Sequence, residues 1–175
     1  MIETFDVRSG TLEDIPGLLR LNSGWLKQNV HGDTSKGFVS GAFNEEDFRS
    51  MINDKMISLA HDGDTVVSYM LSMNNSSSDI LMDHANKAKQ IREDGTVAPE
   101  SRIAIGVQTA VDERFHGSGL INRVRAHFID LLSDRFNYLF TTISKQNPRS
   151  YKSATKYGWI TVGDNDHHYY LIYKV

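Results

Sequence analysis

The chain has 175 residues, a formal net charge of −3 and no cysteine. A chain of this length usually forms one domain, and we expect a single domain over residues 1–175. The absence of a basic excess argues against a nucleic-acid partner, and the absence of cysteine excludes disulfides, thiolate metal ligands and a cysteine nucleophile. Because no apolar run reaches about 18 residues and the N-terminus lacks a signal-peptide pattern, we expect a cytoplasmic protein that makes no membrane contact.

Hydrophobic periodicity and turn residues predict a mixed α/β fold class. In chain order, the expected elements are a strand (2–8), two helices (15–26 and 45–53), two strands (56–61 and 65–73), a helix (79–91), a strand (103–111), a helix (120–132), a strand (137–144), a helix (147–157) and two strands (159–162 and 168–173).

Three local signals support the first half of this pattern. Thr11 followed three residues later by Asp14 indicates a capping box before the first helix. Asn44 is a preferred N-cap for the second helix. Asp62-Gly63-Asp64, which lies between two strand-like runs, is typical of a β-hairpin.

The segment 74–100 interrupts the succession of strands. It contains the expected helix 79–91 and separates two strands that a short turn could otherwise join. Two interpretations are open: the segment is a surface excursion, or it forms a wall on the substrate side.

The stretch that points most clearly to a function is Arg114-Phe115-His116-Gly117-Ser118-Gly119-Leu120, at the joint between the expected strand 103–111 and helix 120–132. Backbone N–H groups at a helix N-terminus carry a partial positive charge and suit a phosphate. The two glycines permit a close approach of the ligand, and Arg114 and His116 can add side-chain donors. The alternative is an ordinary strand–helix loop in which the glycines relieve crowding.

A second pattern follows, in which Asn147 precedes Ser150, Ala154, Gly158 and Trp159. Together with Arg114-x-x-Gly117-x-Gly119, this spacing resembles the GNAT superfamily of acyl-CoA N-acyltransferases. The order of elements agrees with that family over nearly the whole chain, with 74–100 as an insertion between the third and fourth strands. The resemblance implies a twisted, mostly antiparallel seven-stranded sheet with helices on both faces and with parallel fourth and fifth strands that splay apart.

The resemblance also implies a ligand, since the glycine turn would bind the pyrophosphate of acetyl-CoA as co-substrate. Val107, Gln108 and Thr109 would offer backbone groups to the pantetheine arm, as a strand pairs with an extended peptide. Asn147 would hold the pantetheine or the thioester end. Val107 also fits a buried core strand and Asn147 also fits a helix cap, and both pairs of roles are compatible.

The family's usual general acid is a tyrosine seven residues after the asparagine, and this chain has Ala154 there. Tyr151, four residues after Asn147, can reach the same space on a helix and is the candidate acid. The alternative for Tyr151 is packing on a neighbour, and packing is our interpretation of Tyr157.

The general base is less well defined by the sequence. The candidates are acidic or imidazole side chains near the fourth strand or on the inserted helix, and each is also compatible with a solvated charge: Asp83, His84, Glu100 and Glu113. Trp25, Phe38 and Phe43 can line an acceptor pocket, although core packing is the favoured interpretation for Trp25. Because the histidines show no supported metal-ligand spacing, we expect no metal.

Two functions remain open from the sequence. The first is an acetyl-CoA-dependent N-acetyltransferase that acts on the primary amine of a small molecule or peptide, with a homodimer possible. The second is a non-catalytic acyl-CoA-binding regulatory module, which Ala154 and the missing obvious base favour.

Overall fold

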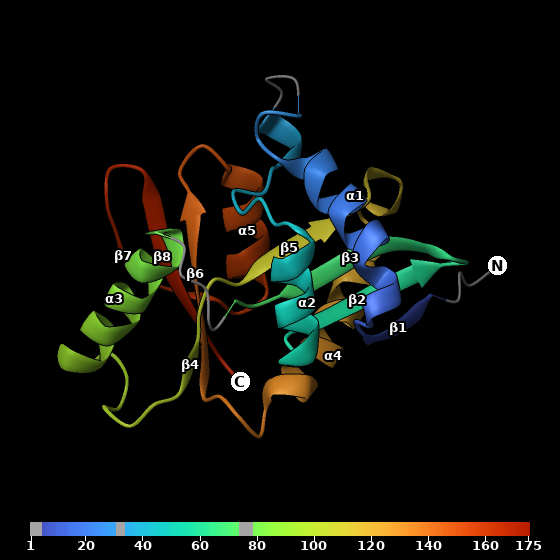
Figure 1. The fold of residues 1–175 in the computed structure, drawn as a ribbon. Coiled ribbons are helices and arrows are strands. Elements are labelled where there is room, and N and C mark those ends of the chain that lie inside the picture. Colours follow the sequence, from blue (N-terminus) through green and yellow to red (C-terminus); the bar gives the residue numbers. More distant parts are fainter. Residues whose placement is uncertain (1–4, 31–33, 74–78) are drawn as a thin grey trace.

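The structure is a computed structural model that describes residues 5–30, 34–73 and 79–175 (Figure 1). Its α-helices are α1 (Ile15–Trp25), α2 (Glu45–Asn53), α3 (Asp79–Glu93), α4 (Leu120–Leu132) and α5 (Pro148–Lys156). Its strands are β1 (Asp6–Ser9), β2 (Ile57–Asp62), β3 (Thr65–Leu71), β4 (Ile103–Ala104), β5 (Gln108–Val111), β6 (Tyr138–Ser144), β7 (Ile160–Asp164) and β8 (His168–Lys174).

The strands form two four-stranded sheets that meet at β4 and β5. The first sheet has the order β1-β2-β3-β5 and is antiparallel throughout. The second has the order β4-β6-β8-β7, in which β4 runs parallel to β6 and the other pairs are antiparallel. The predicted mixed and mostly antiparallel architecture is confirmed.

The predicted continuous strand 103–111 is wrong in one respect, because it breaks into β4 and β5. Gly106 has a φ of +65°, in the left-handed region that favours glycine and that a regular strand cannot contain. The preceding carbonyl, that of Ile105, accepts hydrogen bonds from Ser72 Oγ at 2.6 Å and from the Met73 N–H at 3.1 Å. The break lets β4 pair with β6 while β5 pairs with β3. The predicted strand 103–111 therefore runs parallel to β6 at its start and separates from β6 along β5, as the resemblance implied.

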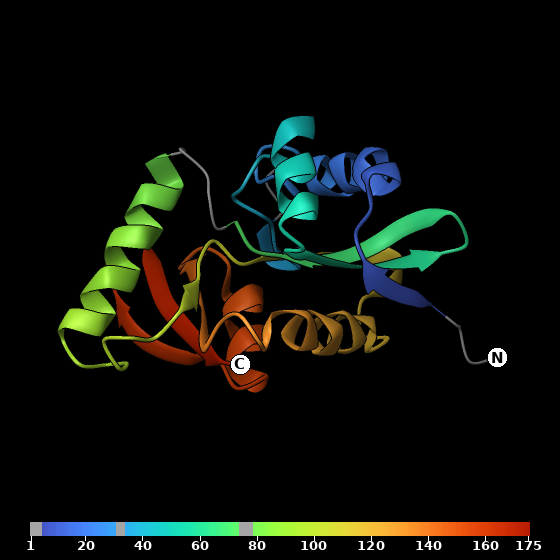
Figure 2. The same cartoon turned by 60° about the horizontal axis from the view of Figure 1, so that its bottom comes forward.

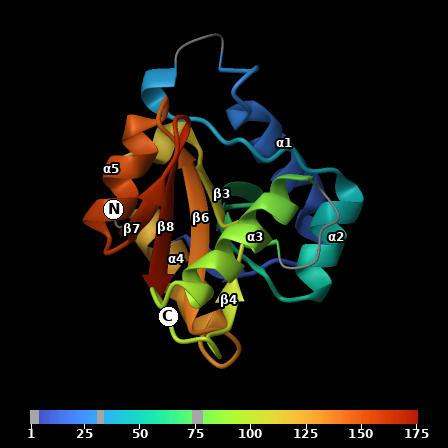
Figure 3. The same cartoon turned by 90° about the vertical axis from the view of Figure 1, so that its left-hand side faces the viewer.

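The helices cover both faces of these sheets (Figures 2 and 3). Helices α1, α2 and α3 lie on one face, and α4 and α5 lie on the other. The side chains of β6 alternate between these faces: Phe140 packs in a cluster with Ala88 and Ile91 of α3, whereas Leu139 and Ile143 belong to the main core that includes α4.

Most local signals in the first half are confirmed. Asn44 accepts a hydrogen bond from the Asp47 N–H at 3.0 Å and caps α2, and the hairpin at Asp62-Gly63-Asp64 joins β2 to β3. Thr11 and Asp14 form the predicted capping box, but the first turn after it is a 3-10 helix over Leu12–Asp14. The expected start of the first strand at 2–4 lies outside the described residues, as does 74–78.

No helix in the described ranges combines the length and the apolar character needed to cross a membrane.

Candidate active site

A cavity of about 640 Å³ crosses the protein where β5 and β6 separate, and residues from both faces of the sheets line it. On one side, which we call the α4–α5 side, the wall includes Gly117, Gly119, Ile121, Arg125, Arg149 and Ser153. On the other, which we call the α2–α3 side, it includes Phe43, Asp47, Met73, His84 and Thr142. One continuous space therefore reaches from the glycine turn to the opposite face.

The gap between β5 and β6 begins just after Val107, where the last hydrogen bonds between the two segments lie. The Val107 N–H reaches the Phe140 carbonyl at 3.5 Å, and the Val107 carbonyl accepts a hydrogen bond from Thr141 Oγ1 at 2.8 Å. Because the Asp112 N–H bonds to the Val67 carbonyl at 2.7 Å, the alternation of an antiparallel ladder directs the Thr109 backbone groups away from β3 and into the gap. An extended ligand can pair with them there.

The glycine turn offers unpaired donors to the α4–α5 side. Gly117 and Gly119 have φ values of +84° and +81°, and a Cβ atom built on either would meet no atom within 4 Å. Neither glycine amide, nor that of Ile121, donates a hydrogen bond within the described part of the chain. These three N–H groups at the start of α4, with open space before them, fit a phosphate.

Two of the predicted ligands in this turn have local partners instead. Arg114 binds the Asp112 carboxylate through Nε at 3.0 Å and Nη2 at 3.1 Å, and it is not among the described residues that line the cavity. The Ser118 hydroxyl donates to the Phe115 carbonyl at 2.7 Å and accepts from the Leu120 N–H at 3.2 Å, which completes the start of α4.

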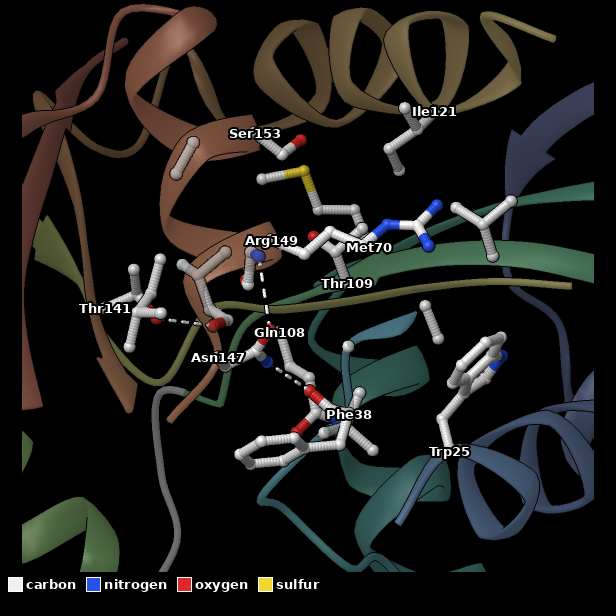
Figure 4. A pocket seen from close by; sticks show the side chains of 18 of the residues that line it. Trp25, Phe38, Met70, Gln108, Thr109, Ile121, Thr141, Asn147, Arg149 and Ser153 are labelled. Atoms are coloured by element: carbon white, nitrogen blue, oxygen red, sulfur yellow. Dashed lines mark hydrogen bonds between the residues drawn. The ribbon is translucent and has the colours of Figure 1, made fainter. Parts of the chain in front are cut away.

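Among the described residues, the lysines and arginines that line the cavity are Lys36, which pairs with Glu113, Arg125 of α4, and Arg149 and Lys156 of α5. Arg149 is exposed, and Figure 4 shows its side chain extending from α5 into the cavity. Arg125 is only 9% exposed, its guanidinium lies 4.1 Å from the centre of the Tyr157 ring, and its Nε has no partner within the described residues. Burial lowers the pKa of Arg125, but an arginine stays charged at neutral pH. A buried cation that has no carboxylate partner among the described residues favours an anionic ligand.

His116 lies between the turn and α1. Its ring is 5.3 Å from the Trp25 ring, and its Nε2 is 3.2 Å from the Val111 carbonyl. Burial and the nearby Arg149 guanidinium lower the pKa of His116. The neutral imidazole therefore contributes a hydrogen-bonding group to the cavity wall at neutral pH.

Asn147 fixes the cavity wall at the start of α5. Its Oδ1 accepts from the Ser150 N–H at 3.2 Å, so it caps the helix as expected. Its Nδ2 donates to the Phe38 carbonyl at 2.8 Å and ties the loop at 38–43 to α5 (Figure 4). Gln108 holds the same loop through the Gly41 N–H, which donates to its Oε1 at 2.9 Å.

A buried tyrosine, Tyr69, binds the two side chains that hold this loop, those of Asn22 and Gln108. The Tyr69 hydroxyl accepts hydrogen bonds from Asn22 Nδ2 at 3.0 Å and from Gln108 Nε2 at 2.9 Å. Complete burial raises the pKa of Tyr69 to about 12, so the phenol remains neutral. The network gives Gln108 a positioning role in addition to its place in the cavity wall.

The α2–α3 side is mostly aromatic and apolar. Asp47, at the first turn of α2, is the one carboxylate among the described lining residues, and it is half-buried. His84 of α3 also lines the cavity, which favours the interpretation of the inserted helix as a wall over that of a surface excursion. Phe38 and Phe43 line the cavity as expected, and Trp25 both lines the cavity and packs against the core.

The structure does not bring Tyr151 to the cavity. Its ring stacks on Tyr169 with centres 4.1 Å apart, and its hydroxyl lies 3.0 Å from Thr161 Oγ1 on β7. Ala154 of α5 and Tyr157, the C-cap residue that follows the helix, do line the cavity. Whether Tyr151 is an acid stays a prediction, but its observed contacts are those of packing.

The remaining candidate bases lie apart from the cavity wall. Glu113 pairs with Lys36, and Glu100 and Asp83 are exposed; none of the three is among the described lining residues. Within the described residues, no three histidine or acidic side chains cluster as they would to hold a metal ion.

The groups that line the cavity match the chemistry of an acyl-CoA. The unpaired amides of Gly117, Gly119 and Ile121 suit the pyrophosphate, the guanidinium groups of Arg125 and Arg149 suit further negative charge, and the gap at β5 and β6 suits an extended arm.

Comparison with known proteins gives a match in structure alone. No family model matches the sequence, and no curated protein matches it. A GNAT-family acetyltransferase from Listeria monocytogenes superimposes with a TM-score of 0.69 over 98% of this chain and 95% of its own, at 15% identity. The chain has the GNAT fold. An acetyltransferase of the same family from Streptococcus pneumoniae matches with a TM-score of 0.65 over 98% of this chain and all (100%) of its own, at 13% identity.

One neighbour with this GNAT fold was solved with coenzyme A. The PaiA N-acetyltransferase from Thermoplasma acidophilum, in complex with coenzyme A, matches with a TM-score of 0.62 over 98% of this chain and 99% of its own, at 10% identity.

Sequence reasoning missed Arg125, Arg149 and Asp47 as cavity residues. Arg125 carried a signal, because it follows Ile121 by four residues and places a charge on the otherwise apolar face of its helix. Arg149 and Asp47 carried none, since a cation near a helix start and an acidic residue in a first turn are common on any surface.

Proposed function

We propose that this protein is an acetyl-CoA-dependent N-acetyltransferase that acts on a primary amine of a small molecule or peptide. The observation that supports the proposal is that one cavity reaches from the glycine turn on the α4–α5 side to the α2–α3 side. Such a path lets the coenzyme enter from the α4–α5 side and lets the amine enter from the α2–α3 side. We also propose that residues 1–175 act as one acetyltransferase domain with 74–100 as its insertion.

The residues of this chain have separable roles in binding the coenzyme. The amides of Gly117, Gly119 and Ile121 hold the pyrophosphate, and Arg149 and Arg125 neutralise negative charge beside it. The Thr109 carbonyl, which faces the gap, positions the pantetheine arm, whereas both backbone groups of Val107 already bind residues of β6. Acetyl-CoA supplies the thioester, and the amine attacks its carbonyl carbon directly.

The gap also provides for the charge that develops during transfer. The Thr109 N–H, which faces the gap, donates to the thioester oxygen as negative charge grows on it, in the manner of an oxyanion hole. On the α2–α3 side, the Asp47 carboxylate attracts a cationic amine toward the gap. The aromatic rings of Phe38 and Phe43 exclude water from the rest of that chamber.

Two measurements test the proposal. Isothermal titration calorimetry should show acetyl-CoA binding, and a free-thiol assay over a broad panel of amines should show coenzyme release that depends on the amine. Absence of acetyl-CoA binding at millimolar concentrations would refute the proposal. Binding without turnover on any amine would favour the alternative function, a non-catalytic acyl-CoA-binding module, for which Ala154 is the motivating observation.

A further inference from the structure

His84 is a buried imidazole at the wall of the α2–α3 side. Its residue is 7% exposed, and its ring packs edge-on against Phe140 with centres 5.8 Å apart. Its Nε2 lies 2.9 Å from Thr142 Oγ1. Its Nδ1 is buried and has no hydrogen-bond partner among the described residues. The packing of the described residues therefore accounts for the Nε2 contact of His84 but gives its Nδ1 no hydrogen bond.

The partner of His84 sits beside the gap through which the coenzyme arm would pass. Thr141 faces the α4–α5 side and binds the Val107 carbonyl at the point where β5 and β6 separate. Thr142, the next residue of β6, faces the opposite way and lines the α2–α3 side. The Thr142 hydroxyl therefore contacts the imidazole on the side of the gap from which the proposed amine would approach.

The surroundings of His84 keep it uncharged near neutral pH. Burial lowers the pKa of His84, the nearby His168 of β8 also lowers it, and Asp83 on the same helix opposes the shift. Among other charged groups, Lys87 of α3 points to the Tyr170 ring of β8, and Asp47 of α2 lines the same cavity as His84. A neutral imidazole can accept a proton, which a protonated one cannot.

We propose that the His84–Thr142 pair removes the proton of the acceptor amine, with Thr142 in contact with the amine and His84 as the positioning residue that holds the proton. This inference rests on the proposed function and names the base that the sequence left undefined. It also gives the inserted helix α3 a role in the reaction.

The step starts from the neutral amine, because an ammonium nitrogen has no free electron pair, and the ammonium form first loses one proton to solvent. As the C–N bond forms, one N–H proton of the amine passes to Thr142 Oγ1 while the hydroxyl proton passes to Nε2 of His84. The C–S bond breaks, its electron pair leaves on sulfur, and the thiolate takes a proton from water. The imidazolium then returns its proton to solvent, so each turnover consumes one acyl thioester and one amine.

The test uses the full chain with acetyl-CoA and the best amine of the panel, with kcat measured from pH 5 to 9. For the wild type, kcat falls as the pH falls through an apparent pKa below about 6.5, the ordinary value for histidine. His84→Gln, which keeps a donor for Thr142, should lower kcat roughly 10²- to 10⁴-fold and remove that acidic limb. The Kd of acetyl-CoA should stay within about twofold. His167→Gln, the same change at an exposed histidine outside the described cavity lining, should retain both rate and profile.

Thr142 provides an independent arm in case His84→Gln does not fold. Thr142→Val removes the hydroxyl at nearly constant shape and should lower kcat in the same way, whereas Thr142→Ser should restore most of the rate. Unchanged kcat and an unchanged acidic limb in His84→Gln or in Thr142→Val would overturn the inference and leave the proposed function intact. Coenzyme binding without turnover by the wild type would overturn both.

Discussion

The two sides of the cavity are built in different ways. The α4–α5 side presents three unpaired backbone amides and the cations Arg125 and Arg149, so it is organised around negative charge. The α2–α3 side presents aromatic and apolar groups, one carboxylate and a neutral imidazole. The α4–α5 side suits the coenzyme, which is the same in every turnover. The α2–α3 side suits a cationic amine that must lose a proton.

The difference shows how the two halves of the function separate. Coenzyme affinity should depend on the α4–α5 side and respond little to changes in α2 or α3. Acceptor recognition and rate should depend on the α2–α3 side and leave coenzyme affinity unchanged. A variant on the α4–α5 side that changes only acceptor recognition, or a variant on the α2–α3 side that changes coenzyme affinity, would therefore contradict this division.

The largest effect on coenzyme binding is expected from Gly119→Asp. The change places a Cβ and a negative charge in the open space before the unpaired amides, so the Kd of acetyl-CoA should rise at least about 100-fold. Gly95→Asp is the matched control, because Gly95 has a similar φ of +79° and open space around it but does not line the cavity. Both variants carry about 1–2 kcal/mol of backbone strain, so calorimetric affinity that is equally weak in both would contradict the assignment.

A smaller loss is expected from Arg125→Met. Removing hydrogen bonds between a guanidinium and an anion costs about 1.5–3 kcal/mol, which corresponds to a Kd for acetyl-CoA roughly 10- to 100-fold weaker. The free energy of unfolding should change by less than about 1 kcal/mol, because the lost cation–π contact and the relieved burial of an unpaired charge oppose each other. Calorimetry and denaturant unfolding measure the two quantities, and Arg123→Met, at an exposed site on the same helix, should alter coenzyme affinity little. Full affinity in Arg125→Met would remove Arg125 from the site.

On the other side, Asp47→Asn should affect the acceptor alone. An incompletely buried ion pair is worth about 0.5–1 kcal/mol, so the KM for a cationic amine should rise roughly two- to fivefold while the coenzyme Kd stays constant. The substituted amide can still accept from the Asn44 N–H, which preserves the helix cap. Glu46→Gln, one residue earlier and exposed, is the control. Steady-state kinetics that place the loss in coenzyme affinity instead would contradict the division into two sides.

The smallest effect is expected from Tyr151→Phe. The substitution keeps the stacking on Tyr169 and removes a hydroxyl that meets Thr161 rather than the cavity. We expect kcat to change less than about twofold, which is the scale of a partly exposed hydrogen bond of about 0.5 kcal/mol. A loss of tenfold or more in kcat at constant coenzyme affinity would establish Tyr151 as the acid after all.

The sequence predicted the parts of this molecule that local chemistry determines. The caps at Thr11 and Asn44 and the hairpin at Asp62-Gly63-Asp64 depend on contacts within a few residues, and each formed as predicted. The glycine turn also formed at the start of α4, because its conformation requires φ values that glycine alone adopts freely.

Side-chain pairings that no spacing pattern specifies, most of them between distant segments, determined the rest. Spacing alone placed Arg114 in the phosphate site, but the Asp112 carboxylate two residues earlier binds its guanidinium. The α2–α3 side assembles from α2, α3 and β6, and no local pattern announces that His84 meets Thr142 across 58 residues. Gly106 lies within the apolar run 103–111 in the sequence. The Ile105 carbonyl before it binds Ser72 and Met73, and no local pattern predicts these contacts.

The central claim is that one ligand runs from the glycine turn through the gap to the opposite face. A crystal structure of the complex with acetyl-CoA tests it most directly. We expect pyrophosphate oxygens within hydrogen-bond distance of the Gly117, Gly119 and Ile121 amides, and an acetyl group in the gap beside Thr142. Phosphates bound elsewhere, or an acetyl group that remains on the α4–α5 side, would contradict it.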